Sequence, residues 1–316
     1  MKKRFMCLFA AISIVTFSCK QTPENNEVQE STDKLGKNYD ELKKIDFEML
    51  KNVLGMDGKE KDGQFKITVP QNDLNIMVDG FKIIPPMGLG SWVVFAPTSD
   101  QTMIMGDIVV TEKDLKPVQQ EVIKQGLIIT AIHNHFVRNE PDVMYMHIGG
   151  LGDEKELAKS VKAVFNKVTE IRGANPANAD VSVVENTLDT NMIDSILGFS
   201  GTMNNGVYKL TIGRPDVDLK VYGAPVSTFL GFNTWASWQG TPENAAVAGD
   251  FTMLADEVAS VIKTLIENDI EVVALHNHMV HENPRIFFLH YWGVGPAEKL
   301  AKGLKAALDE AGATSE

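Results

Sequence analysis

The chain has 316 residues, of which 44% are hydrophobic, and it carries a formal net charge of −12. This length and composition allow a sizeable core and favour two domains over one. The acidic balance disfavours nucleic acid and anionic lipid as direct partners, because both are themselves negatively charged.

The first 18 residues have the composition of a signal peptide. Basic residues at positions 2 to 4 precede a short apolar run, FMCLFAAISIVTFS, and Cys19 follows directly. The run is too short for a transmembrane helix, which needs about 20 apolar residues. Because VTFSC resembles a bacterial lipobox, we expect residues 1–18 to be removed and Cys19 to carry lipid, with ordinary secretory cleavage as the alternative. Cleavage also removes Cys7, so no disulfide is expected.

A polar tether and two copies of one domain are expected after the signal peptide. Residues 19–45 are charged and poor in β-branched residues, as expected of a flexible segment. From Asp46 onward the chain repeats itself at an offset of 143 positions, the spacing of His133 and His276, without a gap through the first copy. A constant offset over this length indicates a duplicated domain. The predicted parts are repeats at 46–168 and 189–312 and a turn-rich linker at 169–188.

Each repeat is predicted to be an α+β domain. In the first copy Asp46 can cap a short helix, FEMLKNVL, which Gly55 ends. Strands are expected at residues 64–69, 75–84, 91–96, 103–110, 127–136 and 142–149. One helix begins after Thr111, where Asp114 completes a capping box, and DEKELAKSVKAVFNKV forms the last helix. The second half is then βαββα in a mixed sheet, with parallel strands before and after the first of these helices.

Histidines form the most specific motif. AIHNHF at 131–136 and ALHNHM at 274–279 are equivalent under the offset, and another histidine follows twelve residues after the second His of each. If the hairpin turns at residues 139–141, His133 lies opposite His147 and three imidazoles share one face. The predicted clusters are His133, His135 and His147, and His276, His278 and His290. The apolar face would carry Ile132, Phe136, Met144, Met146 and Ile148, and Leu275, Met279, Phe287, Leu289 and Tyr291.

Positions can also be predicted for the remaining histidine and for the central asparagine of each HNH motif. His281 is close in sequence to the second cluster and is counted with it. Asn134 and Asn277 should point to the apolar layer and satisfy backbone groups there.

Three neutral imidazoles on adjacent strands can bind a divalent transition metal, with zinc first and copper or iron as alternatives. Three protein ligands leave a position open for water or substrate, as in catalytic metal sites. Asp107 and Asp250 are candidate fourth ligands, candidate acceptors that orient an imidazole, or candidate catalytic groups that position a water. No general base is uniquely placed, so the sequence does not decide whether the chain is an enzyme.

Two interpretations without a metal remain. One is a polar cleft that binds a small molecule or cell-wall glycan, and the other is a scaffold in which the histidines only hold the two strands of the hairpin together. Trp92 and Trp235 match under the offset and could stack on sugars, although such residues more often belong to the core. The sequence contains no HExxH zincin motif, no G-x-S-x-G elbow and no glycine-rich phosphate loop. The literal HNH triplet is not the signature of HNH nucleases.

These motifs resemble the LppY/LpqO lipoprotein family. The resemblance rests on a Gly-Asp pair before a helix, then A-x-H-N-H, a hairpin proline and a later histidine followed by glycine. The residues concerned are Gly106, Asp107, His133 to His135, Pro141, His147 and Gly150, with partners Gly249, Asp250, His276 to His278, Pro284, His290 and Gly293. It covers both copies and implies a duplicated lipoprotein whose domain has no assigned function.

The sequence thus predicts a lipid-anchored protein of the bacterial cell envelope, periplasmic or on the outer surface. Its membrane contact would be the anchor, its further partner a small molecule or glycan, and nucleic acid is not expected.

Overall fold

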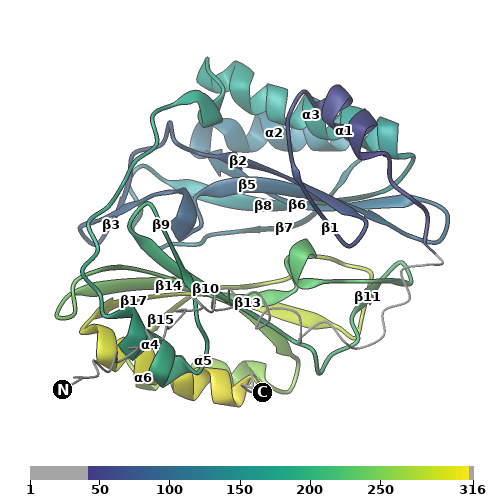
Figure 1. The fold of residues 1–316 in the computed structure, drawn as a ribbon. Coiled ribbons are helices and arrows are strands. Elements are labelled where there is room, and N and C mark those ends of the chain that lie inside the picture. The colour runs from purple at the N-terminus through teal and green to yellow at the C-terminus, as the bar shows by residue number, and fades with distance from the viewer. Residues whose placement is uncertain (1–41, 313–316) are drawn as a thin grey trace, which may run out of the picture.

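A computed structural model describes residues 42–312 and shows two halves of the same construction. Each half is a six-stranded sheet with helices on one face. The two sheets face each other in the middle of the molecule, and the helices cover the two outer faces (Figure 1). The predicted α+β class with two tandem copies is confirmed. The signal peptide, Cys19 and nearly all of the tether lie outside the described residues.

The helices of the two halves correspond. They are α1 (Phe47–Leu54), α2 (Glu112–Lys124) and α3 (Glu154–Arg172), followed by α4 (Thr190–Leu197), α5 (Val258–Glu267) and α6 (Ala297–Glu310). Asp46 caps α1 by accepting from the Met49 backbone N–H, and Gly55 ends that helix with φ 71°. The predicted capping box of Thr111 and Asp114 opens α2. In the described part of the chain, no helix combines the length and apolar character needed to cross a membrane.

The strand order is the same in both sheets. The first sheet has the order β1-β2-β5-β6-β8-β7, and the second has β9-β10-β13-β14-β17-β15. The strands of the first are β1 (Lys59–Lys61), β2 (Gln64–Pro70), β5 (Gly90–Pro97), β6 (Thr102–Thr111), β7 (Ile128–His133) and β8 (Val143–Gly152). Those of the second are β9 (Thr202–Asn204), β10 (Val207–Gly213), β13 (Asn233–Gly240), β14 (Ala245–Leu254), β15 (Glu271–His276) and β17 (Ile286–Gly295).

All neighbouring strands in these sheets are antiparallel, so the sheet is not mixed at the level of adjacent pairs. Strands β6 and β7 do run parallel, as predicted, because both are antiparallel to β8. However, β8 lies between them and pairs with each. The crossover through α2 therefore leaves room for one strand, which the following hairpin fills.

A long connection in each half crosses to the opposite sheet. We call residues 71–89 and 214–232 the first and second arms. The first arm contains β3 (Ile76–Val78), β4 (Phe81–Ile83) and the short helix η2 (Pro85–Met87); the second contains β11 (Lys220–Val221), β12 (Ala224–Pro225) and η4 (Thr228–Leu230). The single strand predicted at 75–84 is wrong, because Asp79 and Gly80 take positive φ values of 47° and 87° and turn the chain into a hairpin.

The core lies in three layers. One apolar cluster lies under the helices of each half, around Phe65 and Ile148 in the first and around Trp238 and Tyr291 in the second. Between the sheets, arm residues of one repeat pack on sheet residues of the other. The first arm supplies Ile76, Ile83 and Met87 against Val207, Ala246 and Ala248. The second supplies Leu219, Val226 and Leu230 against Val94, Ala96 and Met103. The candidate site lies in this central layer.

Candidate metal centre between the repeats

The six predicted histidines meet in one cluster between the two sheets. All are buried, with His290 1% and His276 8% exposed. The closest pairs of histidine rings join different repeats: the centroid separations are 3.9 Å for His133 and His276, 3.9 Å for His135 and His290, and 4.1 Å for His147 and His278. Within a repeat, His133 and His147 are 4.7 Å apart. The two predicted histidine clusters, one in each repeat, therefore meet and form a single cluster.

The strand register explains how the histidines reach this layer. His147 pairs with Ala131, and His133 pairs with Tyr145, so the predicted pairing of His133 with His147 is wrong by two residues. A shift of two keeps every side chain on its face, which is why the imidazoles still point the same way. The connection between β7 and β8 is also longer than a tight hairpin, and His135 lies in it, beyond the end of β7.

The predicted apolar face is correct only in part. Met146 and Ile148 of the first repeat and Leu289 and Tyr291 of the second lie in the cores under the helices. Ile132 and Leu275, however, are 41% and 48% exposed, because β7 and β15 are edge strands whose outward face is only partly covered.

The remaining motif residues separate into interface and surface positions. Asn277 donates to the backbone oxygens of Thr130 and Met279, both at 2.9 Å, as expected of a residue that satisfies backbone groups. The same expectation is not met by Asn134 Oδ1, which is buried without a hydrogen-bond partner among the described residues. His281 is exposed and lies beside the ring of Tyr222 at 5.1 Å, so its grouping with the second cluster is wrong.

Backbone carbonyls fix how three of the imidazoles present their nitrogens. The Nδ1 atoms of His135, His147 and His290 lie 3.2, 3.1 and 3.0 Å from the carbonyl oxygens of Gly88, Gly106 and Gly249. A neutral ring that donates its Nδ1–H to a carbonyl carries its lone pair on Nε2. The Nε2 atoms of His147 and His290 have no hydrogen-bond partner among the described residues. Both nitrogens of His133 and His276 are also unpartnered there.

Burial keeps the cluster neutral and places two carboxyl groups beside it. It lowers the pKa of each of the six imidazoles, which are therefore in the uncharged form that can bind a metal. Burial also raises the pKa of Asp107 to about 6 and that of Asp250 well above its usual range. Asp107 Oδ2 is 3.5 Å from His135 Nε2, and Asp250 Oδ2 is 3.2 Å from His278 Nε2.

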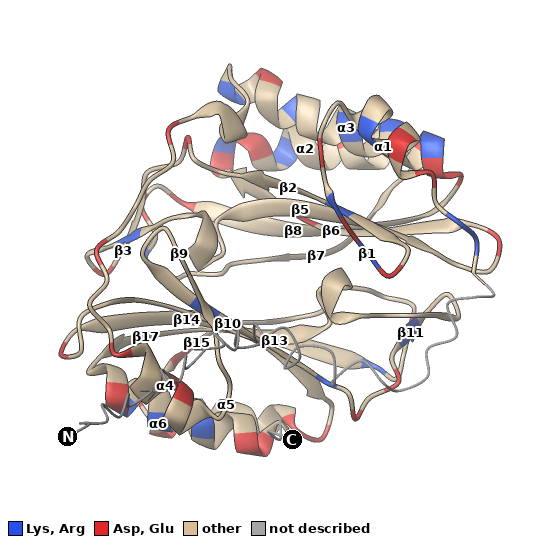
Figure 2. Cartoon of the chain, in the orientation of Figure 1, with Lys and Arg blue, Asp and Glu red and all other residues tan. Residues whose placement is uncertain are grey.

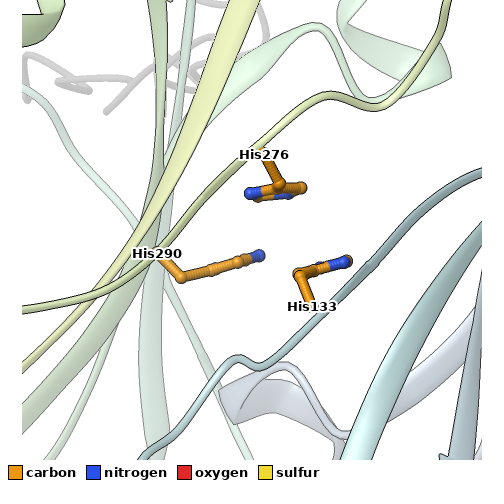
Figure 3. A group of neighbouring side chains, drawn as sticks. All are labelled: His133, His276 and His290. Carbon is orange, nitrogen blue, oxygen red and sulfur yellow. The ribbon is translucent and has the colours of Figure 1, made fainter.

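Three combinations of these side chains could hold an ion. They are His133 with His276 and His290, His147 with His276 and His278, and Asp107 with His133 and His147. In each, the ligand atoms lie within 4.8 Å of one another. Ligands about 2.1 Å from an ion are at most about 4.2 Å apart, so small movements of the rings would suffice. Figure 3 shows the first set, with His133 on one side and His276 and His290 on ribbon of the other repeat.

A cavity of about 630 Å³ opens beside the cluster. Its lining includes four of the six histidines and both aspartates, namely His135, His147, His278, His290, Asp107 and Asp250. Every one of the three ligand combinations contains at least one of these residues. An ion held by any of them would therefore have at least one ligand in the wall of the cavity.

Comparison with protein families gives one match that covers most of the chain. The model of a Domain of Unknown Function (DUF1259) matches residues 48–167 and again residues 191–310. The chain belongs to the DUF1259 family. It contains two tandem copies of this domain, and no curated protein matches the sequence.

Solved structures add no functional argument for these DUF1259 repeats. The double-ringed trimeric shell protein MSM0271 of the RMM microcompartment is 8% identical, with 69% of this chain and 85% of that chain covered and a TM-score of 0.19. EtuB from Clostridium kluyveri is also 8% identical, with 80% and 89% covered and a TM-score of 0.19. Scores this low do not establish a common fold.

The two DUF1259 repeats line the cavity with equivalent residues. Trp92 and Trp235 correspond under the offset, are only half-buried, and both line it, whereas Trp238 and Trp292 are 0% and 2% exposed core residues. The expectation that the matched pair belongs to the core is confirmed in part, because Trp92 packs against the apolar layer of the second arm while both rings also line the cavity.

Sequence reasoning missed two lysines of the DUF1259 repeats. Lys66 and Lys209 are also equivalent under the offset and line the cavity from the middle of β2 and β10. Their signal is visible in QFKITV and VYKLTI, where a charged residue interrupts a strand between an aromatic and an aliphatic neighbour in both copies. Such a position is costly unless the charge has a use.

Proposed function

We propose that the chain binds a divalent transition metal between its two DUF1259 repeats, zinc first, with copper or iron as alternatives. One observation carries the proposal: buried neutral imidazoles from both repeats converge with ring nitrogens that have no other partner in the described part of the chain. Unpaired buried polar atoms are costly, and a bound ion would satisfy them. Imidazole nitrogen is a good ligand for these metals.

We further propose that the ion serves metal-assisted hydrolysis of a molecule in the cavity. A bound ion would supply Lewis-acid chemistry and lower the pKa of a water. Asp107 and Asp250 lie beside His135 and His278 and line the same cavity, so they are placed to orient an imidazole or to hold a proton.

Elemental analysis of protein purified without a His tag tests the metal proposal. We expect near-stoichiometric metal in the wild type and its loss in the His133→Ala/His276→Ala double variant. His281→Ala is the matched control, because His281 is a histidine outside the cluster, and it should retain the metal. Metal-free wild-type protein whose Tm does not respond to a chelator would refute the proposal.

A second candidate function is metal-free binding of a small molecule or cell-wall glycan. Trp92 and Trp235 favour it, because both half-buried rings line the cavity from opposite repeats. A thermal-shift screen of chelator-treated protein against cell-wall glycan fragments tests it. A rise in Tm that disappears in Trp92→Ala/Trp235→Ala would support it, and no rise with any fragment would argue against it.

We also propose that the protein is a lipoprotein of the bacterial envelope, of the LppY/LpqO type. The N-terminal sequence with Cys19 and the motifs shared with that family support this part. Labelled palmitate should be incorporated into the wild type but not into Cys19→Ser. Labelling of both proteins, or of neither, would contradict it.

A further inference from the structure

Two lysines face the cavity from opposite sheets, and each lies over a tryptophan ring. Lys66 Nζ is 4.4 Å from the centre of the Trp92 ring, and Lys209 Nζ is 4.0 Å from that of Trp235. Lys66 also donates to the carbonyl oxygen of Phe229 at 3.1 Å, which belongs to the arm of the other repeat. The second repeat therefore helps to hold the lysine of the first.

Neither ammonium group has a carboxylate within ion-pair distance in the part of the chain that the structure describes. The pKa of both lysines is lowered to about 8, mainly by burial, and for Lys66 also by the charges of Lys209 and Lys59. The charge of Asp250 raises that of Lys209 but does not compensate for burial. Aromatic faces stabilise a cation only weakly compared with a carboxylate. Two half-buried positive charges that repel each other thus lack a strong partner.

The cavity is positive in an otherwise acidic molecule. Four lysines line it, namely Lys59, Lys61, Lys66 and Lys209, against two carboxyl groups, Asp107 and Asp250, whose pKa values are raised by burial, while the whole chain has a net charge of −12. Figure 2 shows blue segments of β1 and β10 where the sheets face each other, and many red segments on the helices and loops. A positive cavity in a negative molecule concentrates field lines on an anionic ligand.

We propose that this cavity binds a small dianionic ligand, whose oxygens accept hydrogen bonds from Lys66 and Lys209 together. Two converging ammonium groups match two negative charges, which a phosphoryl group or two carboxylates can supply. Thr68 and Thr211 line the same cavity and offer hydroxyl groups to the remaining oxygens. The dianion site goes beyond the metal proposal and stands without it, because the lysines are not among the candidate ion ligands.

Calorimetric titration of chelator-treated protein tests the inference, with inorganic phosphate and succinate as probes and acetate as the monoanionic control. We expect at least one dianion to bind more tightly than acetate. Lys66→Met and Lys209→Met should each weaken that binding by about tenfold or more. Lys263→Met removes an exposed lysine of α5 and should leave it unchanged.

Each result of the titration either supports or overturns the dianion site. Binding of phosphate alone supports a phosphoryl ligand, and binding of succinate supports a dicarboxylate. No binding of either dianion, or binding unaffected by both lysine variants, would overturn the inference. Folding of the variants is checked by their Tm, which should not fall, because each removes a desolvated charge and keeps an apolar side chain of similar length. If either variant unfolds, Lys66→Arg keeps the charge and should retain binding; loss of binding in folded Lys66→Arg would count against the site.

Discussion

Backbone carbonyls orient three imidazoles of the central layer. Three Nδ1 atoms lie at hydrogen-bond distance from glycine carbonyls, so the lone pairs of His147 and His290 point away from those carbonyls on Nε2. Gly106 and Gly249 are required at these points, since an added Cβ would come within 2.6 Å of the Trp92 carbonyl oxygen and 2.2 Å of that of Trp235. The orientation of the rings is thus built into the backbone.

The buried carboxyl groups allow a first prediction. Asp107→Asn and Asp250→Asn should each lower metal affinity by about 10- to 100-fold, as expected when a ligand or a group that orients one loses its charge. Competition with a chromophoric chelator measures this. Asp256→Asn, at an exposed aspartate, is the control and should bind as the wild type does. Unchanged affinity in both buried variants would show that neither carboxyl group serves the ion.

The lysine pair gives a pH dependence. Dianion affinity should fall as pH rises through about 8, because Lys66 and Lys209, facing Lys59 and Asp250, then lose their protons. From about pH 8 both probes are already dianionic, so the change reports the protein. Calorimetry across this range should show the decline in dianion affinity, and constant affinity would contradict the prediction.

The stability of the fold has the opposite pH dependence. Since the folded pKa of the lysines lies below the ordinary 10.5, the unfolded chain binds more protons between these values. The lysines' contribution to the free energy of unfolding therefore rises with pH in this range.

Among the elements, the capping box of α2 is the feature that the sequence predicts most directly. Thr111 Oγ1 accepts from the Asp114 backbone N–H, and Asp114 accepts from that of Thr111. Thr111→Ala should lower the free energy of unfolding by about 1 kcal/mol, whereas Thr111→Ser keeps the hydroxyl and should change it little. Urea denaturation measures both. Equal free energies of unfolding for Thr111→Ala and Thr111→Ser would show that the cap does not contribute to stability.

Elements with a local signal could be predicted, and contacts between distant elements could not. FEMLKNVL between Asp46 and Gly55 forms α1 at the expected residues, because cap and stop residues adjoin an amphipathic run. Alternation placed the histidines on one face even though the register was off by two, since parity survives that shift. The insertion of β8 between β6 and β7 depends on pairing between remote segments, which has no local sequence signature.

At the scale of the whole molecule, the arm of each repeat packs on the sheet of the other repeat. Ser237 Oγ donates to the Pro86 carbonyl oxygen of the first arm at 3.0 Å, and Ser227 Oγ of the second arm donates to Gln64 Oε1 at 2.9 Å. Each arm thereby covers apolar residues of the opposite sheet. Equivalent rows of histidines are brought together by this reciprocal packing, which a single repeat cannot supply. Duplication was readable from the offset, but the merging of two clusters into one was not.

A separated repeat should therefore fail to fold as a stable monomer. Residues 42–180 alone would expose the apolar arm and the sheet surface that the second arm covers, so we expect aggregation, self-association or a broad low-temperature transition. Light scattering and thermal denaturation measure this. Co-expression with residues 181–316 should restore a soluble complex. A monomeric fragment that unfolds cooperatively at the Tm of the full chain would show that the repeats fold independently.

The central claim is that one ion site draws ligands from both repeats, and anomalous diffraction tests it most directly. Crystals of the full chain, measured on both sides of the absorption edge of the metal found by elemental analysis, should show a peak bound by side chains on each side of the central layer, such as His133 with His276 and His290. A peak bound by the residues of one repeat alone, a peak elsewhere on the molecule, or no peak in metal-supplemented crystals would contradict the account.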